Sequence, residues 1–478
     1  MKPIVAIRDE TAAASAGRPL SVQWALLGLS LSMLLPSLGT SIANVALPPL
    51  AQAFDASFSQ VQWIVLAYLL AITTLIVSAG RLGDITGRRR LLLAGILLFT
   101  AASVLCGVAP ALWFLIGARA VQGFGAAIMM ALTMAFVGET VAKENTGRAM
   151  GLLGTMSAVG TALGPSLGGI LMAGFGWRAI FLINVPLGVL AFVLSYRALP
   201  VDRLKPGSLR IDFDKSGTLL LVLTLAAYAL ALTMGGVHFG ALNVILLLAA
   251  FLGVGLFALV EARAASPLIR LTMFRDPLLN ASLATNALVA TVIMTTFVVG
   301  PFYLSRAIGL NEALVGIVMS IGPIISTLSG VPAGRIVDRL GSPAVIVIGL
   351  VAMAVGSLAL SVLPAVCGIA SYVAAIAILT PGYQLFQAAN NTAVMMDINP
   401  DQRGVISGLL NLSRNLGLIT GASFMGAVFA LASGTITVAP PAAVVAGTQV
   451  TFAVAAILIV VALAVAVTSR TFAKRAPR

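Results

Sequence analysis

Two arginines lie inside long apolar segments, where a charged side chain is costly. Arg119 falls well inside the segment that begins near residue 112, and Arg414 well inside the one that begins near residue 403. A cation at membrane depth needs partners, so each arginine is a candidate functional group. Two interpretations stay open for both: a charge in a substrate cavity, or a structural arginine that bonds helix carbonyls and amides and so locks two helices together.

No acidic partner for these arginines lies within an apolar segment. All fifteen Asp and Glu residues fall in a loop, in a tail or at the end of a segment. The single histidine, His238, and the separated cysteines, Cys106 and Cys367, do not suggest a metal site, a catalytic triad or a disulfide framework. The chain lacks a G-x-x-x-x-G-K-[ST] loop, so ATP hydrolysis is not expected. We therefore expect neither an enzyme nor a bound metal or cofactor.

The elements that position these residues are apolar helices. Of the 478 residues, 60% are hydrophobic and 9% charged, whereas a soluble domain carries about 25% charged residues. A helix needs about 20 apolar residues to cross a bilayer, and it satisfies its own backbone hydrogen bonds there. Long runs without alternation, such as 219–232, exclude a transmembrane β-barrel. Fourteen segments suited to crossing a membrane begin near residues 22, 60, 91, 112, 147, 178, 215, 241, 279, 312, 344, 367, 403 and 448.

The basic residues indicate how these segments are oriented. If the N-terminus is cytoplasmic, only Arg178 and Arg306 of the 28 Lys and Arg residues fall in outer loops, while Arg119 and Arg414 lie within segments. Lys and Arg gather in cytoplasmic loops, so this distribution supports an even number of spans with both termini cytoplasmic. The net charge of +13 then reflects membrane orientation, and no nucleic-acid partner is expected.

A loop rich in glycine and arginine occurs twice. Gly80-Arg-Leu-Gly-Asp-Ile-Thr-Gly-Arg-Arg-Arg90 separates the second and third segments, and a weaker copy, Gly334-Arg-Ile-Val-Asp-Arg-Leu-Gly341, separates two later ones. The three glycines of the first loop permit a tight turn, and its aspartate can accept backbone N–H groups or pair with an arginine. Both loops resemble the signature loop of the major facilitator superfamily. The resemblance implies state-dependent gating contacts, for which the candidates are Gly80, Asp84, Gly87, Arg88, Arg89, Gly334, Asp338 and Gly341.

An internal repeat supports the same resemblance. Four glycines recur at one constant offset, Gly147, Gly151, Gly160 and Gly164 as Gly404, Gly408, Gly417 and Gly421. An even number of segments separates the copies, so the repeats are parallel, as in the two halves of a major facilitator. We predict an all-α polytopic major facilitator fold of 14 transmembrane helices. Its parts are a cytoplasmic N-tail at 1–21, six-helix halves at 22–198 and 279–470, linkers with an inserted helix pair (about 215–236 and 241–262) at 199–278, and a cytoplasmic C-tail at 471–478.

Two further motifs fall in the N-terminal half. Leu115-x-x-x-Arg119-x-x-Gln122-Gly123-x-Gly125 resembles the arginine motif of the superfamily, and Gly160-x-x-x-Gly164-Pro165-x-x-Gly168-Gly169 resembles its antiporter motif. Such glycines expose a smooth backbone strip, either a plain packing surface or a moving interface, and Pro165 can bend the helix.

The stretch at 177–186 resembles the start of span 6 in drug exporters. With fourteen spans, the chain resembles the multidrug drug:proton antiporters of the quaternary-ammonium exporter type. The resemblance implies alternating-access export of hydrophobic or amphipathic compounds across a bacterial inner membrane. The expected partners are the lipid bilayer, a small-molecule substrate and protons; an accessory periplasmic adaptor is not evident from the sequence.

The first segment departs from that group at one position. The family reads roughly L-D-x-T-I-v-N-V-A-L-P, whereas this chain has Gly39 at the acidic position. In the family this carboxylate is a usual candidate for proton coupling or for contact with cationic drugs. We expect Arg119 to face Gly39 across the cavity, with a bound anion, or with polar side chains and water, in place of the acid.

The expected cavity residues come from spans 1, 4, 7, 10 and 11. They are Gly39, Thr40, Ser41, Asn44, Arg119, Gln122, Asn286, Tyr383, Gln387 and Arg414. Other polar residues of spans 7 and 10 either line the cavity or bond neighbouring helices, namely Asn280, Tyr303, Gln384, Asn390 and Asn391. Because the charges at this depth are positive, a transporter of anionic or neutral metabolites, coupled or uncoupled, is an alternative; a non-transporting membrane sensor is a weaker one.

Overall fold

The computed structural model describes residues 19–140, 146–200, 215–233, 240–264, 271–362, 364–395, 403–434 and 440–475. Within these ranges, 14 helical segments are long and apolar enough to cross a membrane, which confirms the predicted all-α polytopic fold. Most of the spans begin within a few residues of their predicted positions. The largest difference is at the last helix, which begins at Pro441 and not near residue 448.

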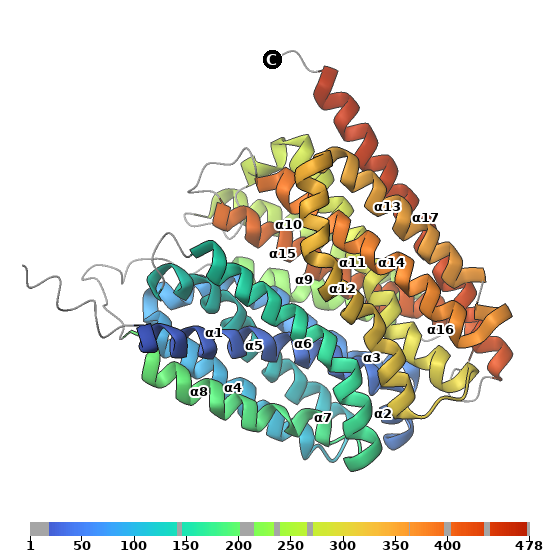
Figure 1. Cartoon of the computed structure of the whole chain (residues 1–478), viewed down its shortest axis with the longest axis horizontal. Coiled ribbons are helices and arrows are strands. Elements are labelled where there is room, and N and C mark those ends of the chain that lie inside the picture. The colour runs from blue at the N-terminus through green and yellow to red at the C-terminus, as the bar shows by residue number, and fades with distance from the viewer. Residues whose placement is uncertain are drawn as a thin grey trace, which may run out of the picture.

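The two six-span halves lie side by side (Figure 1). The N-terminal half consists of α1 (Pro19–Val45), α2 (Leu47–Ala53), α3 (Phe58–Thr86), α4 (Arg88–Gly107), α5 (Leu112–Thr140), α6 (Thr146–Phe175), α7 (Ala179–Leu182) and α8 (Asn184–Ala198). The inserted pair is α9 (Lys215–Thr233) and α10 (Ala241–Arg263). The C-terminal half consists of η3 (Leu271–Arg275), α11 (Pro277–Phe302), η4 (Tyr303–Ala307), α12 (Glu312–Leu340), α13 (Ser342–Val362), α14 (Pro364–Met395), α15 (Arg403–Thr420), η6 (Gly421–Met425), α16 (Gly426–Ser433) and α17 (Pro441–Arg475).

The paired glycine-rich loops are mostly helical, so the expected tight turn involves fewer residues than predicted. α3 continues through Gly80 and Gly83 and ends at Gly87, whose φ is 100°. α12 likewise ends at Gly341, whose φ is 77°. Glycine adopts such positive φ angles at little cost, so one glycine in each motif makes the turn. Gly83 instead allows close helix packing, because a Cβ there would lie 2.5 Å from a methyl of Leu132 on α5.

The two halves pack together at the end of the bundle where α3 begins. We call this the Phe58 end, and the opposite end, where α3 stops, the Gly87 end. The Phe58 ring lies edge-on to Phe302 and Phe429 of the other half, with ring centroids 4.8 and 5.5 Å apart. Aromatic pairs prefer such edge-to-face geometry, so these rings contribute a specific contact between the halves.

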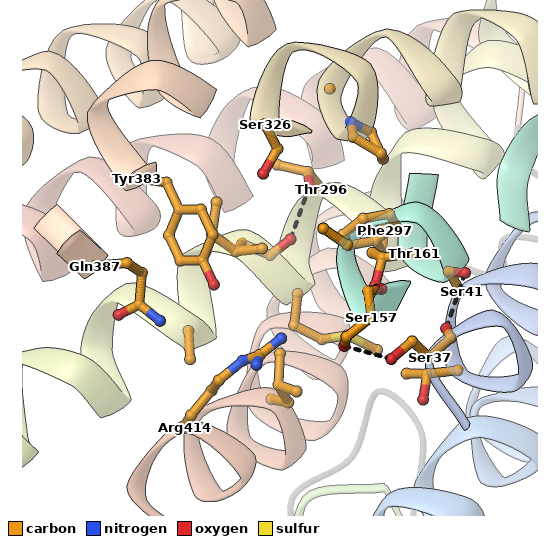
Figure 2. Close-up of a pocket in the computed structure, with 18 of the residues that line it drawn as sticks. Ser37, Ser41, Ser157, Thr161, Thr296, Phe297, Ser326, Tyr383, Gln387 and Arg414 are labelled. Carbon is orange, nitrogen blue, oxygen red and sulfur yellow. Dashed lines mark hydrogen bonds between the residues drawn. The ribbon is translucent and has the colours of Figure 1, made fainter. Parts of the chain in front are cut away.

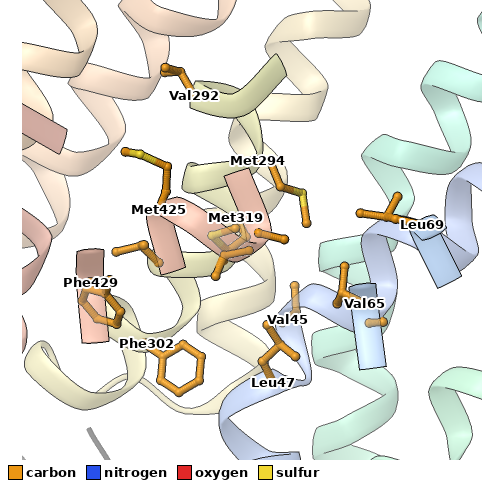
Figure 3. Close-up of a cluster of buried hydrophobic side chains, with 14 of the residues drawn as sticks. Val45, Leu47, Val65, Leu69, Val292, Met294, Phe302, Met319, Met425 and Phe429 are labelled. Carbon is orange, nitrogen blue, oxygen red and sulfur yellow. The ribbon is translucent and has the colours of Figure 1, made fainter. Parts of the chain in front are cut away.

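Further contacts close the same end. Nε2 of Gln62 on α3 donates a hydrogen bond to the carbonyl of Ala422 at 2.6 Å. Figure 3 shows the surrounding cluster of buried apolar side chains, which we call the apolar seal and which includes Val45, Leu47, Val65, Leu69, Val292, Met294, Phe302, Met319, Met425 and Phe429. Residues of both halves contribute to it, so separation of the halves at this end would expose apolar surface.

The inserted helix α9 is attached to the N-terminal half along α3. The hydroxyls of Ser78 and Thr218 lie 2.9 Å apart, and Nε1 of Trp63 donates to the hydroxyl of Thr233 at 3.0 Å. The first bond joins the start of α9 to the later part of α3, and the second joins the end of α9 to the start of α3. The two helices therefore run antiparallel, and α9 is held to α3 over its whole length.

A hydroxyl contact joins α9 to the C-terminal half. The phenol of Tyr228 donates to the hydroxyl of Thr420 on α15 at 3.2 Å. α10 packs against α9, and much of its apolar surface is exposed, as at Phe251 and Leu252. Such a surface suits contact with lipid.

Candidate functional site

A cavity of about 450 Å³ lies between the two halves. Helices α1, α3, α5 and α6 line it from the N-terminal half, and α11, α12, α14 and α15 from the C-terminal half. The lining residues on α3 are Leu69, Ile72 and Ile76, which lie between the middle of that helix and the Gly87 end. A cavity of this volume is suited to a small molecule.

The N-terminal wall of the cavity carries hydroxyl groups. The hydroxyls of Ser37 on α1 and Ser157 on α6 lie 2.6 Å apart, and Ser41 donates to the carbonyls of Ser37 and Gly160 (Figure 2). Nδ2 of Asn44 donates to the carbonyl of Thr40 at 2.9 Å. The other amide atom, Oδ1, is buried and has no hydrogen-bond partner among the described residues.

The C-terminal wall carries amides, a phenol and one charge. Tyr383 and Gln387 of α14 and Arg414 of α15 point into the cavity together (Figure 2). The guanidinium of Arg414 is only partly buried and makes no hydrogen bond or ion pair within the described part of the chain. It is the only charged group among the described lining residues. Oε1 of Gln387 is also buried there without a described partner.

Large apolar side chains form the end of the cavity next to the apolar seal. Met294 and Phe297 come from α11, Met319 from α12 and Tyr372 from α14. The Tyr372 hydroxyl lies 3.5 Å from the sulfur of Met319. Methionine adapts its shape and contacts aromatic groups favourably, so this surface suits the apolar part of an amphipathic molecule.

Arg119 lies outside the cavity, contrary to expectation. It is fully buried on α5, where Nε donates to the carbonyl of Ile64 and Nη2 to the carbonyl of Gly39, both at 3.0 Å. Nη1 donates to Oε1 of Gln122, whose own amide donates to Ser103 at 2.7 Å. The arginine therefore joins α1, α3 and α5 of one half, which is the structural interpretation left open above. Gln122 is likewise outside the cavity.

An aromatic ring lies beside Arg119, where a bound anion, or polar side chains and water, had been expected. The guanidinium carbon lies 4.0 Å from the centroid of the Tyr68 ring, and the Tyr68 hydroxyl donates to the carbonyl of Pro36 at 2.9 Å. A Cβ at Gly39 would lie 3.2 Å from that hydroxyl. Gly39 thus leaves room for Tyr68, and a cation–π contact with two carbonyl bonds stabilises the arginine without an acid. The buried charge of Arg119 is therefore stabilised without a bound anion and without contact with the cavity.

The polar residues of span 7 are used mainly for helix packing. Asn286 is buried outside the cavity and donates to the carbonyl of Leu410 at 2.9 Å, which joins α11 to α15. Asn280 of the same span and Asn390 of span 10 also donate to backbone carbonyls. Tyr303 is buried and stacks on Tyr372, with ring centroids 5.8 Å apart.

Of the remaining candidates in spans 1, 10 and 11, most line the cavity. They are Thr40, Ser41, Asn44, Tyr383, Gln384, Gln387, Asn391 and Arg414.

The glycine strip of α6 faces two different partners. Gly160, Gly164 and Gly168 pack against α1 of their own half, where a Cβ at Gly164 would lie 2.6 Å from the Cβ of Ser41. Gly169 and the carbonyl of Pro165 meet α12 of the other half. There a Cβ at Gly169 would lie 2.9 Å from the Cα of Gly316 on α12. The motif is thus a packing surface at three glycines and an interface between the halves at the fourth.

The predicted gating loops are described only in part. The side chain of Asp84 lies outside the described residues, and that of Asp338 is exposed. Arg89 donates to the carbonyl of Tyr196 and lies 5.0 Å from the centroid of its ring, which ties the start of α4 to the end of α8. The state-dependent role of Gly80, Gly334, Arg88 and the other loop residues remains a prediction.

Several cavity residues were missed from the sequence. They are Ser37, Ser157, Thr161, Thr296, Phe297, Ser326, Asn411 and Asn415. Helical spacing could have found some of them: Asn411, Arg414 and Asn415 lie at i, i+3 and i+4 on α15, and so share one face.

Comparison with known proteins agrees with this architecture. The family model described as Major Facilitator Superfamily matches residues 29–422. The riboflavin transporter RibZ of Clostridioides difficile is 29% identical over 85% of this chain and 88% of its own length. The multidrug resistance protein Stp of Mycobacterium tuberculosis is 30% identical over 85% of this chain and 75% of its own.

Solved structures are similar in fold. A bacterial homologue of the human lysosomal transporter Spinster, inward-facing and unoccupied, aligns with a TM-score of 0.70 at 16% identity, over 97% of this chain and 100% of that one. A point mutant of the nucleoside transporter NupG aligns with a TM-score of 0.64 at 14% identity, over 94% of this chain and 99% of that one. With fourteen spans, two six-helix halves and a family match over most of its length, this chain belongs to the Major Facilitator Superfamily of membrane transporters.

Proposed function

We propose that this transporter exports hydrophobic or amphipathic small molecules by alternating access of its two halves around the cavity. The observation that carries the proposal is the cavity itself, which is walled by both halves and has an apolar end beside polar walls. A cavity at the interface of two repeats is where transporters of this kind bind their substrates. The similarity to proteins named as multidrug transporters supports drug-like compounds as the substrate class.

The proposal includes an orientation and a location. Basic loops favour the cytoplasm for the Gly87 end and for both termini. The similarity to bacterial transporters supports the inner membrane of a bacterium as the location. The cavity of this structure would then face the cytoplasm, and the apolar seal at the Phe58 end would block the outer side. Export would require the seal to open while the Gly87 end closes.

Proton exchange is part of the proposal that rests on the family resemblance. The described lining holds no carboxylate and no histidine, so a proton carrier must lie elsewhere in the chain. Of the acidic side chains that the structure describes, only Glu261 is buried, and it lies near the end of α10, away from the cavity lining.

A metabolite transporter is the second candidate. It is favoured by the positive charge of the cavity and by similarity to a protein named as a riboflavin transporter.

Reconstitution in proteoliposomes tests both candidates and the coupling. Vesicles would be loaded with neutral, anionic or cationic amphipathic dyes or with riboflavin, and initial rates measured with and without an imposed pH gradient. We expect protein-dependent transport of amphipathic dyes that a pH gradient accelerates, compared with protein-free liposomes. An initial rate that does not depend on the pH gradient would contradict proton coupling but not export of the dyes. Movement of riboflavin but of no dye would favour the second candidate.

A further inference from the structure

The two arginines within the spans differ in their hydrogen-bond partners. Arg119 is fully buried, and every part of its guanidinium has a partner in carbonyls, Gln122 or the Tyr68 ring. Arg414 is partly buried, faces the cavity and has no partner of that kind within the described residues. Arg119 therefore joins helices of one half, whereas the N–H donors of the Arg414 guanidinium face the cavity.

Resting on the proposed function, the geometry points to a substrate class: an amphipathic anion, whose carboxylate or sulfonate binds Arg414. The planar guanidinium matches two oxygens of such a group and holds them by paired, charge-assisted hydrogen bonds. Tyr383 and Gln387 point to the same part of the cavity and can supply further hydrogen bonds to the acid (Figure 2).

The rest of the cavity fits the remainder of such a molecule. Met294, Phe297 and Met319 offer an apolar surface to a ring or an alkyl chain. The hydroxyls of Thr40 and Thr161 on the opposite wall donate to carbonyls of their own helices, and their remaining lone pairs can accept an N–H from the same molecule.

The charge of Arg414 also disfavours cations. No described lining residue carries a negative charge to offset it, and a like charge in a site of low dielectric constant is repelled strongly. A cationic compound would therefore bind less well than a neutral one of the same shape, and an anionic one better.

A ligand trio that shares one ring system tests this inference by equilibrium binding to the purified full-length protein. The probes are naphthalene-1-sulfonate, naphthalene-1-sulfonamide and trimethyl(1-naphthylmethyl)ammonium. The variants are Arg414→Gln and Arg414→Lys, with Arg306→Gln as a matched control, because Arg306 does not line the cavity.

We expect the wild type to prefer the sulfonate, then the sulfonamide, then the ammonium compound. Arg414→Gln should weaken sulfonate binding about 10- to 100-fold, the range for hydrogen bonds to a charged group. Its sulfonamide affinity should change little, which also shows that the variant is folded. Arg414→Lys should keep part of the preference, and Arg306→Gln all of it.

Equal sulfonate affinity in wild type and Arg414→Gln, or tighter binding of the ammonium compound by the wild type, would overturn the inference. The inference would also be overturned if the protein transported cationic dyes but bound none of the three naphthalene compounds. The proposed function would then still stand. Selective sulfonate binding without any transport in proteoliposomes would contradict the proposed function and leave the anion site intact.

Discussion

Replacing Gly169 by alanine should shift the balance between the two conformations of the transporter. A Cβ at this position would lie 2.6 Å from the carbonyl oxygen of Glu312 and 2.9 Å from the Cα of Gly316. Both neighbours are backbone atoms of α12, so no side chain can rotate away. The helices of the two halves must separate here, and this contact lies at the closed Phe58 end.

The size of the effect follows from the overlap. Forcing one methyl group into a packed contact costs about 1–3 kcal/mol. If the open conformation relieves that cost, the equilibrium moves toward opening by a factor of about 5–150. Alanine also raises intrinsic helix stability by about 1 kcal/mol relative to glycine. Gly174→Ala is the matched control for that term, because Gly174 lies on the same helix with no atom within 4 Å of the added Cβ.

Electron paramagnetic resonance distances across the Phe58 end measure the shift. Spin labels at Gln52→Cys on α2 and Ala442→Cys on α17, both exposed positions, report the separation of the halves in a protein without native cysteines. We expect Gly169→Ala to enrich the longer distances, and Gly174→Ala to match the parent. An unchanged distance distribution in a stable Gly169→Ala protein would show that this helix crossing does not set the balance between the two conformations.

Three further changes should act on stability or on the cycle. Arg119→Ala should lower the stability of the protein by about 2–5 kcal/mol, through the loss of a fully buried side chain and its bonds, without changing ligand preference. Thermal unfolding in detergent measures the stability, and equilibrium binding of the three naphthalene compounds measures the preference. A changed preference would contradict the structural role. Tyr228→Phe removes the hydroxyl contact between α9 and α15 of the C-terminal half. It should change the free-energy difference between the two conformations, measured by the same spin-label distances, by no more than about 1 kcal/mol. A larger change would mean that the contact of α9 with α15 is a main determinant of the closed conformation. Asp84→Asn should impair transport more than folding, and wild-type transport by a well-expressed variant would exclude a gating role for that carboxylate.

The spans, their number and their halves could be predicted because apolar length and repeated glycines are properties of the sequence. The depth of Arg119 in its helix was predictable in the same way. Its direction was not, because a cavity face and a packing face of one helix are only about half a turn apart, and the neighbouring helices determine which face is which. Tyr68, which stabilises Arg119, is a common aromatic residue with no motif of its own.

The antiporter motif shows the same limit. Its glycines predict close packing, but the positions of α1 and α12 around α6 determine that Gly164 meets its own half and Gly169 the other. Polar residues that share one helix face could have extended the predicted site, because Asn411 and Asn415 lie beside Arg414 on α15, yet only Arg414 was identified. Hydroxyl residues such as Ser157 and Thr161 also bond their own helices in membranes, so their presence alone does not identify a cavity.

Binding of the substrate by Arg414 is tested most directly by counterflow of radiolabelled naphthalene-1-sulfonate in proteoliposomes, with the matched sulfonamide as reference. We predict that the wild type exchanges the sulfonate faster than the sulfonamide, and that Arg414→Gln loses this preference while it still exchanges the sulfonamide. Equal sulfonate exchange by wild type and Arg414→Gln, at equal protein content in the vesicles, would contradict the claim that Arg414 binds the substrate during transport.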